Sequence, residues 1–187
     1  FKSANDLLAA ARAAPGNLTY GTAGVGSIGH LVTEMFSAAA KIRMRHVPYK
    51  GAAIAAIDLA GGQIQVMVSS FSTLSPFLKA DKVRLLAVTS AQPHPSFPDL
   101  PPLANTLPGF SSNTWVGVFA PAGTSPRLIE RLNREINEIS VLPEMKALLE
   151  PDGMLPLAIS PAAFSARLQQ ELGQWKQIAE SQKIVAE

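Results

Sequence analysis

The chain has no cysteine, and this absence removes several kinds of chemistry at once. None of its 187 residues can form a disulfide, supply a thiolate to a metal or act as a thiol nucleophile. Histidine is also scarce: only His30, His46 and His94 occur, and none of them lies in a metal-binding spacing such as H-E-x-x-H. The serine motif G-x-S-x-G is missing too. We therefore expect a protein that is not an enzyme and that uses no metal and no other cofactor.

Charge and long apolar runs are equally sparse. Charged residues make up 16% of the chain, and the formal net charge is +2. The nearest thing to a basic patch, residues 41–46, alternates basic with apolar residues, which is typical of an edge strand and argues against nucleic-acid binding. No apolar run approaches the ~20 residues that span a bilayer. With 47% hydrophobic residues, the chain predicts a globular protein of about one to one and a half domains.

The most informative stretch is Leu18-Thr-Tyr-Gly-Thr-Ala-Gly-Val-Gly-Ser-Ile-Gly-His30. It predicts a short strand, a glycine-rich loop and a helix that begins near Ser27. Glycine allows positive φ and a close approach of the backbone to a ligand. The first N–H groups of the helix, together with its dipole, favour an anion at the loop. His30, in the first turn of that helix, is expected to tie the loop down.

The same loop also contains a G-x-G-x-x-G match at Gly24, Gly26 and Gly29. In dinucleotide-binding proteins, an acidic residue about 20 positions later holds the ribose. Here Tyr49 and Lys50 occupy that region, so the fingerprint is incomplete, although Lys50 could meet a 2′-phosphate. An NADP-binding oxidoreductase fragment therefore remains the alternative function.

Helical and strand patterns alternate along the first 90 residues, which predicts an α/β fold with a parallel-dominated sheet. The apolar stripe Leu128, Leu132, Ile136 and Ile139 is expected to face a core. A proline-rich segment, residues 92–109, is expected to be a stiff crossover between lobes. The expected helices cover residues 1–14, 27–40, 52–60, 74–80, 126–139, 143–150 and a last long one from 161, and the expected strands cover 18–20, 43–48, 64–70, 83–89 and 115–120.

Ligands of parallel α/β sheets bind outside the carboxyl ends of the strands. The segments that leave those ends supply backbone N–H groups at helix starts, several hydroxyls and one ammonium, and they contain no carboxylate. Such a rim suits a small carboxylate held by charge-assisted hydrogen bonds. The expected ligand-binding residues are Thr22, Ala23, Gly24, Gly26, Ser27, Tyr49, Lys50, Gly51, Ser69 and Ser70.

Five motifs follow one another in order along the chain. They are Tyr20-Gly-Thr-Ala-Gly-Val-Gly-Ser27 with His30-Leu31, His46-Val-Pro-Tyr-Lys-Gly51, Asp58-Leu59 with Gly61-Gly62-Gln63, Leu86-Ala-Val-Thr89 and Phe119-Ala-Pro-Ala-Gly123. This ordered series resembles the solute-binding proteins of tripartite tricarboxylate transporters, the Bug family, over essentially the whole chain. It is far more specific than any single motif.

The resemblance implies a periplasmic-binding-protein type II-like fold that closes on a small carboxylate (a di- or tricarboxylate, an amino acid or an aromatic acid). The solute would then pass to a membrane permease, and the protein would work in the periplasm. Residues 1–109 would form the second ligand-binding lobe, and 110–187 would form a hinge strand and C-terminal helices that return to the first lobe. The resemblance places that lobe ahead of Phe1. Without it, exposed apolar faces would favour an oligomer.

Overall fold

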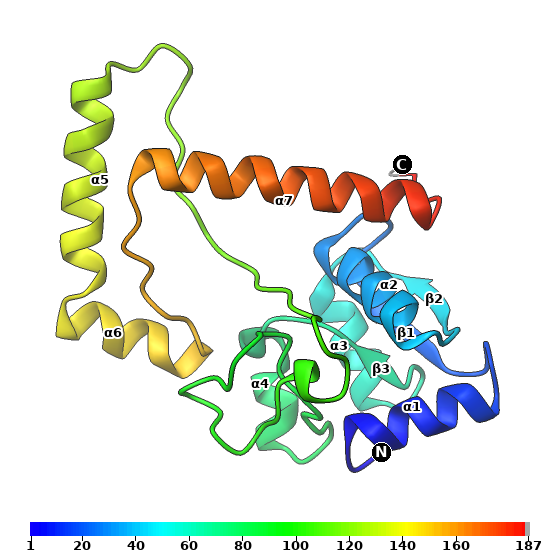
Figure 1. The fold of residues 1–187 in the computed structure, drawn as a ribbon. Coiled ribbons are helices and arrows are strands. Elements are labelled where there is room, and N and C mark those ends of the chain that lie inside the picture. The colour runs from blue at the N-terminus through cyan, green and yellow to red at the C-terminus, as the bar shows by residue number, and fades with distance from the viewer. Residues whose placement is uncertain (186–187) are drawn as a thin grey trace. The chain divides into compact units, whose positions relative to one another are not determined.

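The structure is a computed structural model that describes residues 1–185, coloured along the chain in Figure 1. It contains two compact units. The first unit comprises residues 1–114 and the residues from 177 onward, and the second unit comprises residues 115–176. None of the helices formed by these described residues combines the length and the hydropathy needed to cross a membrane.

A three-stranded parallel sheet lies at the centre of the first unit. Its strands are β1 (Thr19–Thr22), β2 (Arg45–Pro48) and β3 (Val66–Met67), in the order β2-β1-β3. Tyr20 of the central strand pairs with His46 on one side and with Val66 on the other. All four residues of β1 are buried, as expected for a strand with a neighbour on each side. The predicted α/β architecture with a parallel sheet is confirmed.

Helices alternate with these strands (Figure 1). They are α1 (Ala4–Ala13), α2 (Ile28–Ala40), α3 (Ala52–Ala60) and α4 (Phe71–Lys79). Ser3 and Ser27 cap α1 and α2, since each side chain accepts a hydrogen bond from the N–H group three residues later. Helices α2, α3 and α4 each begin just after a strand, so their N-termini all lie at the carboxyl ends of the strands.

The core of the first unit is built from these elements. Helix α1 buries Leu7 and Leu8, and Tyr20 and Ile64 are almost inaccessible. Phe36 of α2 packs edge-on against Phe110, with ring centroids 6.2 Å apart. The proline-rich segment contributes Leu103 and Leu107 to the core, and it contains a short 3-10 helix, η1 (Leu103–Asn105).

Two predicted strands of this unit are wrong in whole or in part. The apolar run of residues 64–70 forms a strand only at Val66–Met67. Residues 83–89 form no strand: Val88 makes a single parallel bridge to Pro102, and the rest of the run is only partly covered. A proline donates no N–H, so pairing with the proline-rich segment cannot extend into a ladder. Helix α4 begins three residues earlier than residues 74–80 predict.

The second unit is helical. It contains α5 (Pro126–Ser140), α6 (Pro143–Leu149), the 3-10 helix η2 (Glu150–Asp152) and most of α7 (Pro161–Ser181). The strand predicted for residues 115–120 is wrong: this extended segment has no strand partner among the described residues. Its first residue is held by side chains instead, since Trp115 Nε1 donates to Glu171 Oε2 at 2.7 Å and the indole meets Phe164 edge-on.

Helix α5 departs most clearly from expectation. Its stripe of Leu128, Leu132, Ile136 and Ile139 was expected to face a core, yet these side chains are 39–48% exposed and no residue of α5 is buried. The helix forms because its own pattern and Pro126 at its start favour it. Nearly half of each of these side chains stays open to solvent. Such a stripe supports self-association, which remains a prediction.

Candidate functional site

The three loops that follow β1, β2 and β3 form one continuous edge, which we call the carboxyl edge (residues 23–27, 49–51 and 68–70). The loop after the central strand lies against the second loop, and the first turn of α2 that follows it lies against the third. A Cβ atom added at Gly24 would lie 3.4 Å from the carbonyl oxygen of Tyr49, and one added at Gly29 would lie 2.9 Å from that of Val68. The sheet order thus brings together the three segments that contain the ligand-binding residues expected from the sequence.

The glycine loop presents unpaired backbone donors at this edge. Gly24 and Gly26 adopt φ of 131° and 75°, which side chains rarely allow. The Ser27 hydroxyl donates to the carbonyl of Gly24 at 2.7 Å and fixes the turn. Within the described residues, the N–H groups of Ala23, Val25 and Ile28 have no acceptor. Free donors at a helix start are a ready anion site.

The second loop adds another helix start and a cation. Gly51 precedes α3 with φ 122° and ψ 152°, and no side chain caps this helix. The exposed Lys50 stands beside it. Tyr49 is more constrained, because its N–H donates to the carbonyl of Thr22 at 3.1 Å and its hydroxyl donates to Asp58 Oδ2 at 2.7 Å. Burial and this carboxylate raise the pKa of Tyr49. Because the Tyr49 hydroxyl already donates its hydrogen bond to Asp58, it can only accept a hydrogen bond from a ligand.

The third loop brings hydroxyls to the same edge. Ser69 is half-buried and Ser70 is exposed. Ser70 precedes α4 without capping it through its side chain, and its hydroxyl lies 2.9 Å from that of Thr73. The Ser70 hydroxyl also accepts from the Ser72 hydroxyl at 3.3 Å, and one O–H of the Ser70–Thr73 pair remains to donate to a ligand.

Thr22 takes a different position from the other predicted residues. It is 1% exposed, so its hydroxyl lies beneath the glycine loop. That hydroxyl is 2.7 Å from His46 Nε2 and accepts the Gly24 N–H at 3.2 Å. In the structure as described, Thr22 contributes to the edge through the shape of the loop.

Sequence reasoning missed a stack of rings below this loop. His30 of α2 and His46 of β2 stack with centroids 3.9 Å apart, and Tyr20 of β1 continues the stack 4.9 Å from His46. The Tyr20 hydroxyl donates to Glu34. As expected, His30 ties the loop down, because its Nδ1 accepts the Gly26 N–H at 3.2 Å. Only the strand register, which sets Tyr20 opposite His46, could have revealed the stack.

The stack keeps both histidines neutral near pH 7. Burial lowers the pKa of His30, an effect that Glu34 partly opposes. Burial and the neighbouring His30 lower the pKa of His46 from 6.5 to about 4. Burial and the bond to Glu34 raise the pKa of Tyr20.

These shifts predict how stability depends on pH. Between pH 6.5 and about 4, His46 of the unfolded chain binds a proton that the folded chain does not. The free energy of unfolding should therefore fall as the pH drops through this window, by on the order of 2 kcal/mol, and level off below it. Urea denaturation at a series of pH values measures this. His46→Gln should show a shallower fall, and parallel curves for the two proteins would contradict the assignment.

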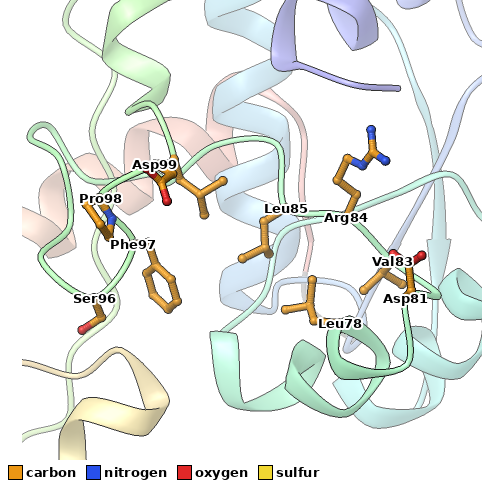
Figure 2. A pocket seen from close by; sticks show the side chains of 10 residues that line it. Leu78, Asp81, Val83, Arg84, Leu85, Ser96, Phe97, Pro98 and Asp99 are labelled. Carbon is orange, nitrogen blue, oxygen red and sulfur yellow. The ribbon is translucent and has the colours of Figure 1, made fainter.

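An open cavity of about 410 Å³ lies away from the carboxyl edge, beyond the C-terminal end of α4 (Figure 2). Figure 2 shows Leu78, Leu85 and Phe97 gathered between two segments of the first unit. The sequence did not predict this cavity. No group of metal-ligating side chains is found there or elsewhere among the described residues. Its lining comprises Leu78, Asp81, Val83, Arg84, Leu85, Ser96, Phe97, Pro98, Asp99 and Leu100.

Comparison with known protein families gives a match over nearly the whole chain. Residues 1–184 match the family described as the tripartite tricarboxylate transporter family receptor, TctC. The chain belongs to this family. Membership confirms the resemblance seen in the sequence, and it decides against the oxidoreductase alternative because the family consists of solute-binding receptors rather than enzymes.

One relative aligns with almost the whole chain. A UPF0065 protein in the tcbD-tcbE intergenic region of Pseudomonas sp. strain P51 is 36% identical over 180 residues, which are 95% of this chain and 54% of that protein. The chain thus spans about half the length of this relative.

Solved structures show the same fold. A structure described as R. palustris Rpa4515 with adipate has 31% identity and a TM-score of 0.89, and the match covers 100% of this chain and 63% of that one. The periplasmic binding protein BugD has 25% identity and a TM-score of 0.83, with coverage of 100% and 64%. The predicted periplasmic-binding-protein fold is therefore confirmed for this TctC chain.

Proposed function

We propose that this chain supplies one wall of the ligand site of a periplasmic receptor that captures a small carboxylate for a tripartite tricarboxylate transporter. The observation that carries the proposal is the carboxyl edge. Three helix starts meet there, and backbone N–H groups of Ala23, Val25 and Ile28 remain without acceptors among the described residues. The ligand-binding residues proposed from the sequence belong to, or directly support, this edge.

The chemistry of the edge suits a carboxylate. Its two oxygens accept several hydrogen bonds at once, and bonds to a charged acceptor are stronger than those between neutral groups. Lys50 adds a cation beside the start of α3. Adipate in the related R. palustris structure supports a dicarboxylate as the ligand class here. Residues 1–109 would act as one lobe of a receptor that closes on the solute and delivers it to a membrane permease.

A thermal-shift and calorimetry screen tests the proposal. Adipate, other dicarboxylates and aromatic acids should each be offered to the protein, with NADP as the comparison. We expect at least one carboxylate to raise the melting temperature and to bind by calorimetry, since a ligand that binds only the folded state stabilises it. Stabilisation by NADP without any carboxylate effect would overturn the proposal.

Lys50→Ala should weaken adipate binding about fivefold, the equivalent of roughly 1 kcal/mol for a partly solvated charge-assisted contact. Lys79→Ala is the matched control, because Lys79 is an exposed lysine in the last turn of α4, at the other end of that helix from the edge. Calorimetry on both variants measures the difference. Equal losses would mean that only the overall charge of the protein matters.

A further inference from the structure

His30 caps the helix that follows the glycine loop with its side chain as well as its backbone. Its N–H donates to the Ser27 hydroxyl at 3.4 Å, while its Nδ1 accepts the N–H of Gly26 at 3.2 Å. The pattern resembles a capping box, in which a Glu or Gln side chain accepts from the N–H of the cap residue, except that the His30 ring accepts from Gly26, the residue before the cap. An imidazole in this role differs from a Gln in one respect, because it can be protonated at acidic pH.

The bond from Gly26 to His30 requires a neutral ring. A neutral imidazole has one acceptor nitrogen, whereas the imidazolium ion has none. Protonation of Nδ1 would therefore place two donors, the Gly26 N–H and the Nδ1–H, against each other. The Gly26 end of the loop would lose its anchor.

His46 connects the other end of the loop to the same pair. Its Nε2 lies 2.7 Å from the Thr22 hydroxyl, which accepts the N–H of Gly24 at 3.2 Å and donates to the carbonyl of Gly24 at 3.1 Å. The rings of His30 and His46 lie 3.9 Å apart and nearly parallel, at 11°, so a charge on one opposes a charge on the other.

Two further titratable groups face the histidine pair. Tyr20 of β1 lies 4.9 Å from His46 and 6.3 Å from His30, and its hydroxyl donates to Glu34 of α2. Glu34 is the carboxylate that acts on His30. The raised pKa of Tyr20 keeps its hydroxyl protonated throughout the acid range.

Resting on the proposed function, we propose that His30 is a positioning residue that holds the 23–27 loop ready for a carboxylate only while its ring is neutral, and that the stacked ring of His46 supports it in that state. Acidification then loosens the loop and releases the carboxylate. Neither histidine needs to touch the ligand.

The first test uses nitrogen-15 NMR on the free protein. The Gly26 amide signal should move with the same midpoint as the His30 Nδ1 signal, below the ordinary histidine value of about 6.5. His30→Asn keeps an acceptor near the Nδ1 position but cannot titrate, so its Gly26 signal should stay constant. His30→Phe keeps a ring for stacking but has no acceptor, and at about pH 7.5 its Gly26 signal should resemble that of the acidified wild type.

The second test measures adipate binding by calorimetry for the same three proteins at about pH 7.5 and at about one pH unit below the His30 midpoint found by NMR. At a given pH, adipate is protonated to the same extent in all three experiments. The ratio of the Kd values of two proteins therefore reports only the difference between the proteins. At the higher pH, the His30→Phe protein should bind adipate about fivefold more weakly than wild type. The His30→Asn protein should bind it as tightly as wild type. At the lower pH, the adipate affinity of wild type should fall to that of the His30→Phe protein. The His30→Asn protein should then bind about fivefold more tightly than both.

A Gly26 signal that does not follow His30 in the wild type overturns this inference, as does equal binding by the Asn and Phe variants. The wild-type titration decides alone if a variant fails to fold. Absence of adipate binding by wild type near pH 7.5 would contradict the proposed dicarboxylate, and the NMR titration would still decide the role of the histidines.

Discussion

Gly21→Ala is expected to lower the free energy of unfolding by about 2–3 kcal/mol, the upper part of the range for overpacked cores. A Cβ at this position would lie 2.2 Å from Ile64 Cδ1 and 3.2 Å from the Tyr49 ring. Ile64 is only 2% exposed and has little room to withdraw. Gly21 lies on the central strand, so the displaced atoms belong to the part of the sheet that supports the carboxyl edge.

Gly173→Ala is the control for this prediction. Gly173 lies within α7, and a Cβ there would have no atom within 4 Å. Alanine in the interior of a helix is more favourable than glycine by roughly 0.5–1 kcal/mol, so this variant should be as stable as the parent or more stable. Urea denaturation monitored by circular dichroism measures both. A Gly21→Ala protein as stable as the Gly173→Ala protein would show that the packing around β1 is looser than described.

Gly51→Ala should reduce adipate binding at least tenfold. The φ of 122° and ψ of 152° at Gly51 belong to a region that only glycine enters readily, and an alanine held there would cost about 1–3 kcal/mol. No atom lies within 4 Å of the added Cβ, so the strain comes from the backbone alone. The 49–51 loop can relieve it by rotating, and that rotation would turn the first N–H groups of α3 away from the edge.

Gly62→Ala separates this effect from general strain. Gly62 follows the other end of α3, has φ of 74° and likewise has open space around its Cβ position. Alanine there costs about 1–2 kcal/mol for the left-handed backbone. Denaturation should show both variants destabilised, while calorimetry should show that only Gly51→Ala loses adipate. Equal binding by the two variants would remove the start of α3 from the proposed site.

Local signals in the sequence were sufficient for the elements around the sheet. Ser27 followed by an apolar period of 3.6 predicted α2 almost to the residue, and Gly61-Gly62 marked the end of α3. The alternation of strand and helix gave the parallel sheet, and the rule for parallel sheets then gave the carboxyl edge. These features depend on neighbours along the chain, which a sequence shows directly.

Features that depend on distant partners could not be predicted in this way. Residues 83–89 have the composition of a buried strand, but the segment opposite Val88 is rich in proline and cannot continue a ladder. The stripe on α5 has the period of a core-facing helix, yet its side chains stay 39–48% exposed. The stack of Tyr20, His46 and His30 depends on strand register, which no spacing in the sequence encodes.

Titration of the nitrogen-15-labelled protein with adipate, followed by its amide signals, tests the central claim most directly. The free N–H groups of Ala23, Val25 and Ile28 and those at the start of α3 should move as adipate reaches millimolar concentration, because a carboxylate that accepts a hydrogen bond changes the environment of the donor. The signals of α1 and α5 should stay in place. Movement confined to the cavity around Leu85 and Phe97, or no movement at all, would contradict the proposal that the carboxyl edge binds the carboxylate.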